Sequence, residues 1–256
     1  PVSAYLRDRH VVITGATSGL GLATATALAA RGAELTLVAR DRAKANGVAQ
    51  DLKRRFGNPR VHVEIADLSL LDDVRALVAR LLEKGRPIDV LVNNAGALIN
   101  PREETIEGLE KSFALLLAGP YVLTEGLRPL LKKAAAARGV ARVVNVLSGG
   151  MYTQKIHVED LQSEKGEYSG AVAYARAKRG LLIVTEEWAR RWAKDGIVVN
   201  AMHPGWADTP GVVSSLPAFH RVTEKVLRTP EEGADSIVWL GRVHTISRNA
   251  STISAK

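Results

Sequence analysis

Short runs of β-branched residues alternate with longer helical stretches along most of this chain. Such runs include His10–Thr14, Glu34–Ala39 and Ala141–Leu147, and each is followed by a helical pattern or a turn. Runs without polar interruption, such as Val90–Val92, are typical of a parallel sheet that helices cover on both faces. The sequence therefore predicts a single α/β domain of the Rossmann type, with a doubly wound parallel sheet, over residues 1–256.

The same patterns give expected bounds for the individual elements. The predicted strands are His10–Thr14, Glu34–Ala39, Arg60–Ile65, Asp89–Val92, Ala141–Leu147 and Ile197–Met202. The predicted helices are Leu20–Arg31, Arg42–Phe56, Leu71–Lys84, Glu107–Leu131 and Ala171–Asp195. Within the long fourth helix, Gly119 and Pro120 are expected to cause a bend.

Composition excludes several kinds of protein. The chain has no cysteine, which rules out disulfides, thiolate metal sites and a cysteine nucleophile, and we expect no bound metal. It has no apolar run long enough to span a membrane, and the polar segment Pro1–His10 leads into the first strand without a signal-peptide pattern. These features favour a cytoplasmic location.

The chain is basic, with 35 lysines and arginines against 27 acidic residues and a net charge of +8. This excess could indicate nucleic-acid binding or simply solvated helix faces, as at Lys53–Arg55, Lys132–Lys133 and Arg190–Arg191. No zinc-ligand spacing or aromatic RNA-binding pattern accompanies these runs, so we predict no nucleic-acid partner. A basic surface would still attract a phosphorylated cofactor.

A glycine-rich segment, Thr14–Gly21, connects the first predicted strand to the first helix. Small residues at this place allow a tight turn, and they let backbone amides at a helix N-terminus approach a pyrophosphate. The alternative is an ordinary tight turn, which the strand–turn–helix context makes less favoured. The predicted dinucleotide contacts here are Gly15, Thr17, Ser18, Gly19, Leu20 and Gly21.

The end of the second predicted strand bears on the choice between NAD(H) and NADP(H). An NAD site needs an acidic group there for the ribose 2′-hydroxyl, but this chain has Ala39 followed by Arg40. A guanidinium can pair with a 2′-phosphate, whereas a carboxylate would repel it. We therefore predict that NADP(H) is favoured over NAD(H), with Arg40 as the selecting residue. Arg42 could assist or be a surface arginine.

Several motifs together resemble the short-chain dehydrogenase/reductase family from about Arg9 to Leu240. Those motifs are Thr14-Gly-x-x-x-Gly-x-Gly21, Asp67-Leu68, Asn93-Asn94-Ala95-Gly96, Ser148, Tyr174-x-x-x-Lys178 and Pro204-Gly205. Within the family, Ser148–Met151, Asp160–Ser163 and Met202–Pro210 resemble the dehydrogenase/reductase member 12 group and the neighbouring retinol dehydrogenase-like branch.

This resemblance implies further cofactor contacts. Asp67 and Leu68 would lie at the adenine, and Asn94, Ala95 and Gly96 would support the edge of the cofactor site. Pro204 and Gly205 would border the nicotinamide carboxamide, with Thr209 as a donor to it. The family also implies a homo-oligomer, an expectation that the unusual C-terminal segment weakens.

Tyr174 and Lys178 stand one helical turn apart, so they share a helix face. A phenol, with a pKa of about 10, is a poor base at neutral pH, but a nearby ammonium, added to the cation of an oxidised nicotinamide, lowers that pKa. Tyr174 is thus the predicted acid/base, and Lys178 would also hold the nicotinamide ribose. Ser148 would hydrogen-bond the substrate oxygen. The alternative for an isolated Tyr-x-x-x-Lys pair is a surface pair without function.

Two features depart from the family pattern. Leu116 occupies the position of an asparagine that arranges a proton relay through water, and a leucine cannot hydrogen-bond. The relay is therefore missing or rerouted, or the enzyme is slow. The C-terminal segment 241–256 is polar and weakly patterned, and only Val243–Ile246 resembles a strand.

The segment of about 206–228 is expected to form a lid over the substrate. Candidate apolar wall residues are Met151, Trp206, Leu216 and Phe219, for which core packing or a surface patch is the alternative.

The favoured function is NADP(H)-dependent interconversion of a carbonyl and an alcohol in a small, partly apolar molecule. A second hypothesis is a degenerate member that binds the dinucleotide as a regulatory module, and a distant third is a nucleic-acid-binding protein.

Overall fold

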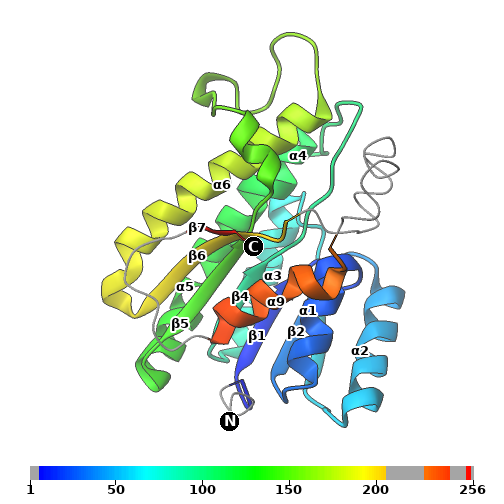
Figure 1. Ribbon diagram of the computed structural model, residues 1–256, viewed down its shortest axis with the longest axis vertical. Helices are drawn as coiled ribbons and strands as arrows, with labels where there is room; N and C mark the ends of the chain where they lie inside the picture. Colours follow the sequence, from blue (N-terminus) through cyan, green and yellow to red (C-terminus); the bar gives the residue numbers. More distant parts are fainter. Residues whose placement is uncertain (1–5, 206–227, 243–251, 255–256) are drawn as a thin grey trace.

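The computed structural model describes residues 6–205, 228–242 and 252–254, and these build a seven-stranded sheet in the order β3-β2-β1-β4-β5-β6-β7 (Figure 1). Every pair of neighbouring strands is parallel. The strands are β1 (His10–Thr14), β2 (Glu34–Ala39), β3 (Val61–Ile65), β4 (Val90–Asn93), β5 (Ala141–Val146), β6 (Ile197–His203) and β7 (Thr252–Ser254). The predicted α/β class and parallel sheet are confirmed.

Helices cover both faces of the sheet. α1 (Gly19–Ala29), α2 (Arg42–Phe56) and α9 (Pro230–Arg242) lie on one face, and α3 (Leu71–Lys84), α5 (Gly119–Arg138) and α6 (Gly170–Trp192) lie on the other (Figure 1). The short elements are α4 (Lys111–Phe113), the π-helix η1 (Ala114–Ala118), and the 3₁₀ helices η2 (Gly149–Thr153), η3 (Val158–Asp160) and η4 (Ala193–Asp195).

The long helix predicted over Glu107–Leu131 differs most from its expected form. It begins at Lys111, where the Glu110 side chain accepts the first amides, and it continues to Arg138. The expected bend is the π-helix η1. Pro120 has no N–H to donate to the carbonyl of Leu116, four residues earlier, so a regular α-helical bond cannot form at this point.

The C-terminal segment was left open by the sequence. Thr252–Ser254 forms β7 and pairs with Ala201–His203 of β6, so the sheet extends past β6. The strand-like run Val243–Ile246 lies outside the described residues. Among the helices that the structure describes, none combines the length and the apolar composition required to cross a bilayer.

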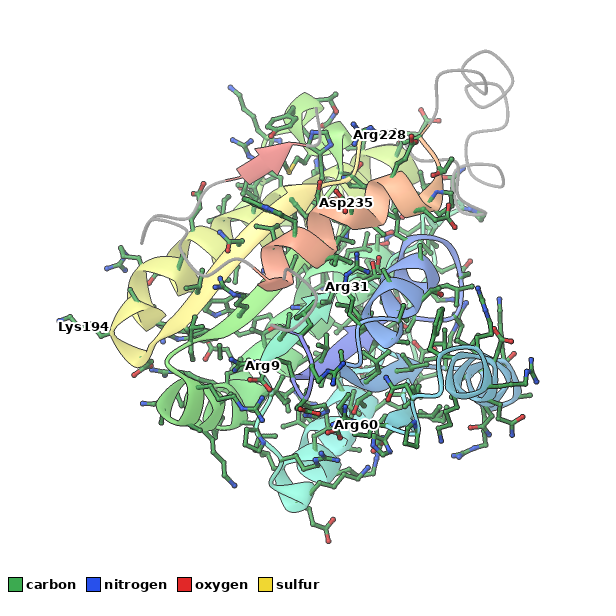
Figure 2. All side chains as sticks on the ribbon, turned by 60° about the horizontal axis from the view of Figure 1, so that its bottom comes forward. Arg9, Arg31, Arg60, Lys194, Arg228 and Asp235 are labelled. Atoms are coloured by element: carbon green, nitrogen blue, oxygen red, sulfur yellow. The ribbon has the colours of Figure 1, made fainter. Side chains whose placement is uncertain are left out.

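Basic residues on the helices are partly neutralised by neighbouring acids. Arg54 and Arg55 both pair with Asp51 on α2, and Arg190 pairs with Glu187 on α6. Figure 2 shows Arg31, Arg60 and Lys194 on different parts of the molecule. The ion pairs on α2 and α6 agree with the interpretation of the basic runs as solvated helix faces.

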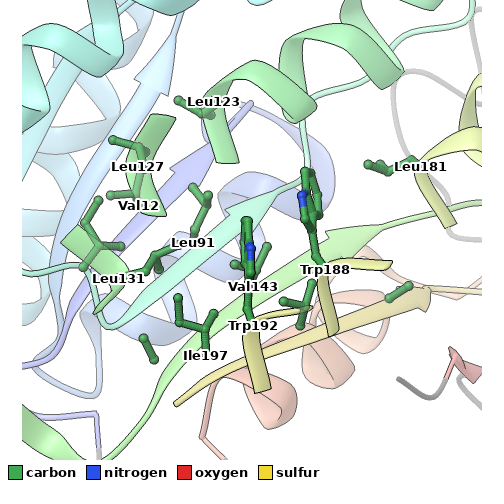
Figure 3. Packing of buried hydrophobic residues seen from close by; sticks show 14 of the residues in the cluster. Val12, Leu91, Leu123, Leu127, Leu131, Val143, Leu181, Trp188, Trp192 and Ile197 are labelled. Carbon is green, nitrogen blue, oxygen red and sulfur yellow. The ribbon is translucent and has the colours of Figure 1, made fainter. Parts of the chain in front are cut away.

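The core on the α3/α5/α6 face contains two tryptophans of α6. The rings of Trp188 and Trp192 stack with their centres 5.3 Å apart, and both are fully buried (Figure 3). Tyr121 of α5 stacks on Trp188 at 5.7 Å, and the Trp188 indole N–H donates to Glu125 at 2.7 Å. Large buried aromatic rings such as these contribute strongly to packing energy, so they fix α6 against α5.

A chain of buried amides and hydroxyls crosses the sheet just below its carboxyl end. The Asn93 amide donates to Asn145 (2.7 Å) and Thr124 (2.9 Å), and the Asn145 amide donates to Thr185 of α6 (2.8 Å). The Thr185 hydroxyl donates in turn to the carbonyl of Leu181 (2.6 Å). Because buried polar groups are costly when unpaired, this chain ties β4 and β5 to the helices on one face.

We expect Thr185→Val to lower the free energy of unfolding by about 1–3 kcal/mol, because it leaves the buried Asn145 amide without an acceptor. Thr26→Val is the matched control, since Thr26 also donates to the carbonyl four residues earlier but accepts no side chain in the described structure. Urea unfolding of both variants measures the effect. Equal losses in the two variants would contradict the role of the amide chain.

Candidate active site

The turn between β1 and α1 is shaped by glycines. Gly15 and Gly19 have positive φ angles of 66° and 50°, and the Gly15 amide donates to the carbonyl of Val38 at 3.0 Å. A Cβ on Gly15 would lie 2.8 Å from Cα of Ala95, and one on Gly21 would lie 2.1 Å from the Gly15 carbonyl oxygen. Neither position has room for a side chain, because other backbone atoms lie so close. The turn is therefore as tight as the sequence predicts.

Thr14, which the sequence analysis did not single out as a site residue, joins this turn to the end of β4. Its hydroxyl accepts from the amides of Asn94 (2.9 Å) and Ala95 (3.0 Å) and donates to the carbonyl of Val92 (3.2 Å). The Asn94 side chain donates to the Thr14 carbonyl at 2.9 Å. A threonine directly before the glycine turn, with an asparagine pair after β4, is the signal that could have revealed this link.

The first turn of α1 is open to an anion. Ser18 is the N-cap, but its side chain makes no capping bond, and the first turn contains no acidic residue. Amides at a helix start have no partner within the helix and carry the positive end of the helix dipole. Ser18, at the predicted pyrophosphate position, is exposed.

Arg40 lies exposed at the end of β2. Within the described part of the chain it makes no ion pair, and the neighbouring Asp41 carboxylate is engaged as the N-cap of α2, where it accepts from the Lys44 amide at 2.9 Å.

Asp67, at the end of β3, is half-buried and accepts from the backbone and side chain of Ser69 at 2.9 and 2.7 Å. A cation and an anion therefore stand at the ends of adjacent strands. Leu68 follows Asp67, and its carbonyl lies so close to Gly119 that a Cβ there would be 2.3 Å away.

Ser148, Tyr174 and Lys178 meet beyond the end of β5. Ser148 is the N-cap of η2 and shares a hydrogen bond with the Tyr174 hydroxyl. The Lys178 ammonium donates to the carbonyl of Val146 at 2.6 Å and lies 5.9 Å from the centre of the Tyr174 ring. The structure thus brings together the three residues that the sequence predicted as catalytic.

Burial dominates the electrostatics of this group in the chain without cofactor. Lys178 is 3% exposed, and burial lowers its pKa to about 8. Burial also raises the pKa of the Tyr174 phenol, and the hydrogen bond from Ser148 opposes this only in part. The prediction that Lys178, together with the cation of an oxidised nicotinamide, lowers the pKa of Tyr174 concerns the complex with cofactor and stays a prediction. In this state Tyr174 is a protonated phenol, which suits a proton donor.

Leu116 and Lys178 both lie near Gly96. Leu116 is fully buried in η1, and a Cβ on Gly96 would lie 3.1 Å from Cδ2 of Leu116 and 3.7 Å from the Lys178 nitrogen. An apolar side chain therefore occupies the position where the family places a relay asparagine.

The start of α6 is anchored by contacts that the sequence did not indicate. The Tyr168 hydroxyl lies 3.0 Å from the buried Glu110 carboxylate and 3.2 Å from the carbonyl of Ile99. A Cβ on Gly170 would lie 2.2 Å from the same Ile99 oxygen. These contacts fix the N-terminal end of the helix that carries Tyr174.

The substrate side is only partly described. Met151 is fully buried in the core, so it presents no surface to a substrate in this structure. Pro204 is buried and Gly205 has a φ of 76° at the end of β6. The remaining predicted residues, Thr209, Trp206, Leu216 and Phe219, lie outside the described residues, as does the lid segment up to residue 227.

Comparisons with known proteins agree with this geometry. The profile of the family described as short chain dehydrogenase matches residues 9–218. The chain is 41% identical to human "Dehydrogenase/reductase SDR family member 12", over 93% of this chain and 73% of that protein. It is 34% identical to human "Retinol dehydrogenase 11", over 91% and 73%. The L-sorbose reductase of Gluconobacter frateurii, solved in complex with NADPH and L-sorbose, superposes with a TM-score of 0.77 at 26% identity, over 99% of this chain and 97% of that one.

The burial of Lys178 predicts a dependence of stability on pH. A group whose pKa falls on folding, here from 10.5 to about 8, binds fewer protons in the folded chain than in the unfolded chain between these values, so stability rises with pH. Lys178→Met removes this contribution. Between pH 7 and pH 9 the wild type should therefore gain about 1 kcal/mol of unfolding free energy relative to Lys178→Met.

Denaturant unfolding of the two proteins across this pH range measures the difference. Lys194→Met, at an exposed position in η4, is the matched control for the loss of a lysine. If the wild type gains no more unfolding free energy relative to Lys178→Met than relative to Lys194→Met, the Lys178 ammonium is not desolvated as described.

Proposed function

We propose that this chain prefers NADP(H) and uses Tyr174 as its acid/base. The chain belongs to the short-chain dehydrogenase/reductase family of NAD(P)-dependent oxidoreductases, which act on CH–OH groups. The observation that carries the proposal is the meeting of Ser148, Tyr174 and Lys178 beyond β5. The substrate would be a small, partly apolar carbonyl compound or alcohol.

The residues around the β1–α1 turn fit a dinucleotide. Gly15 and Gly21 keep the backbone clear of side chains, and the first turn of α1 offers amides without a capping side chain. Asn94, through Thr14, holds the end of β4 against this turn. These groups would bind the pyrophosphate, with Asp67 at the adenine side.

The preference for NADP(H) rests on Arg40. Its guanidinium is exposed at the end of β2, and the carboxylate of Asp41, which could otherwise neutralise it, accepts from the Lys44 amide. An exposed guanidinium can pair with a 2′-phosphate through two hydrogen bonds. Support also comes from the L-sorbose reductase, which was solved with NADPH.

The proposed chemistry begins with the protonated phenol of Tyr174. Burial holds the pKa of this group high, so it would donate its proton to a carbonyl oxygen during reduction. Ser148 would donate to the same oxygen and stabilise the charge that develops there. The bound nicotinamide would supply the hydride. Lys178, held on the Val146 carbonyl, would orient the ribose and return a proton toward Tyr174.

One observation favours a second function. Leu116 is fully buried beside Gly96 and Lys178, where it can neither donate nor accept a proton. A chain of this kind could bind the dinucleotide with little turnover and act as a binding or regulatory module. A cytoplasmic location and homo-oligomer formation stay predictions from the sequence.

The proposed mechanism predicts that Tyr174→Phe lowers kcat/KM by at least about a hundredfold, the usual scale of an acid–base contribution. NADPH oxidation against a panel of ketones, aldehydes and quinones provides the assay. The NADPH dissociation constant should change little, because the phenyl ring is kept. Tyr121→Phe, on α5, is the matched control for the loss of a phenol.

Turnover that survives in Tyr174→Phe would overturn the role of Tyr174. NADPH binding without turnover of any panel member would favour the binding module.

The proposed cofactor preference predicts that Arg40→Ala raises the KM for NADPH by about tenfold or more, because a charge-assisted hydrogen bond contributes about 1.5–3 kcal/mol. The KM for NADH should hardly change. Arg42→Ala, one residue past Asp41, is the matched control and shows whether a second arginine takes part. A wild type that prefers NADH, or an unchanged KM for NADPH in Arg40→Ala, would refute the assignment.

A further inference from the structure

His203 is the last residue of β6 and stands directly before Pro204 and Gly205. Its Nδ1 accepts a hydrogen bond from the Gly205 amide at 3.2 Å. Gly205 has a φ of 76°, in the left-handed region that favours glycine. The imidazole thus closes the turn that follows β6.

The same ring lies against the turn that carries Ser148. A Cβ on Gly149 would lie 3.9 Å from Cε1 and 4.0 Å from Nδ1 of His203, which is ordinary contact distance. The ring of Tyr152, also in η2, meets the imidazole edge to face, with centres 6.3 Å apart and planes at 80°. Two loops that leave neighbouring strands, β5 and β6, therefore pack on one imidazole.

We propose that His203 is a positioning residue that couples the Pro204–Gly205 turn to the Ser148 turn through its ring and through the unprotonated Nδ1. The inference rests on the proposed function, in which the first turn borders the nicotinamide and Ser148 faces the substrate oxygen. With the turn closed, the Pro204–Gly205 turn and the Ser148 turn are held in one arrangement before the cofactor binds, which lowers the free-energy cost of binding.

The bond requires a lone pair on Nδ1. Protonation would place an N–H at Nδ1, opposite the N–H of Gly205, and the turn would lose its closing bond. Burial and the positive charge of Arg228 lower the pKa of His203, so the neutral form prevails at pH 7. Arg228 and Tyr152 are the charged and titratable groups that face the ring in the described structure.

Arg228 stands just before α9 (Figure 2). Its Cδ would lie 3.1 Å from a Cβ on Gly205, so this cation packs against the same turn. The neutral state of His203 is therefore supported by a neighbour from another element.

Three variants distinguish the packing of the His203 ring from the hydrogen bond that Nδ1 accepts. His203→Phe keeps an aromatic ring against Gly149 but has no acceptor, whereas His203→Asn offers an oxygen near the position of Nδ1. His157→Phe, at an exposed position, is the control for the loss of a histidine. The measurements are the NADPH dissociation constant, by fluorescence titration between pH 5 and pH 8, and kcat/KM at pH 7.5.

We expect His203→Phe to bind NADPH about five- to tenfold more weakly at pH 7.5, the size of one lost hydrogen bond. His203→Asn should stay within about twofold of the wild type, since the acceptor is restored. As the pH falls below the ordinary histidine value, the wild-type affinity should fall further than that of His203→Asn, in which the 2′-phosphate of the cofactor still titrates but the imidazole is absent. Thermal unfolding of each variant shows whether it is folded.

An affinity for NADPH in His203→Phe equal to that of the wild type would overturn the inference, as would a loss of affinity on acidification that is as large in His203→Asn as in the wild type. Both results leave the proposed function intact, because the wild type would still bind and oxidise NADPH. A wild type that does not bind NADPH would refute the proposed function itself.

Discussion

The site depends on a close backbone contact between the turn after β1 and the end of β4. Gly15 and Gly21 leave no room for a side chain at this contact, and the Thr14 hydroxyl bonds to both amides that follow the first asparagine of the pair. β1 lies between β2 and β4, so the chain runs outward in opposite directions from this point. In open α/β sheets ligands bind where the strand order reverses, and α1 begins at this point with no side-chain cap from Ser18.

The group of Ser148, Tyr174 and Lys178 shows how burial can shift pKa values at the expense of stability. Lys178 is almost fully buried, and its pKa falls to about 8 as a result. The same burial keeps Tyr174 protonated, which favours proton donation over proton removal in the absence of cofactor. The cation of an oxidised nicotinamide ring beside the phenol would lower its pKa, so the acid/base behaviour belongs to the complex and not to the chain alone.

Sequence and structure differ in helix bounds and where a contact depends on distant segments. The helix predicted over Glu107–Leu131 begins at Lys111, continues to Arg138 and contains the π-helix η1 just before Pro120. β7 was not predicted, because Thr252–Ser254 has no strand pattern of its own and pairs only through its position beside β6. The contact of Tyr168 with Glu110 joins residues far apart in the chain, so spacing could not reveal it.

The sequence by itself determined the parallel α/β class, the place of the glycine turn and the identity of the Ser148, Tyr174 and Lys178 group, because periodicity and short motifs are local properties. Only the tertiary structure decided that Lys178 is buried, that Met151 belongs to the core and that His203 joins two turns. Burial and pKa depend on what the rest of the chain packs around a group. Such surroundings come from segments that no local pattern places together.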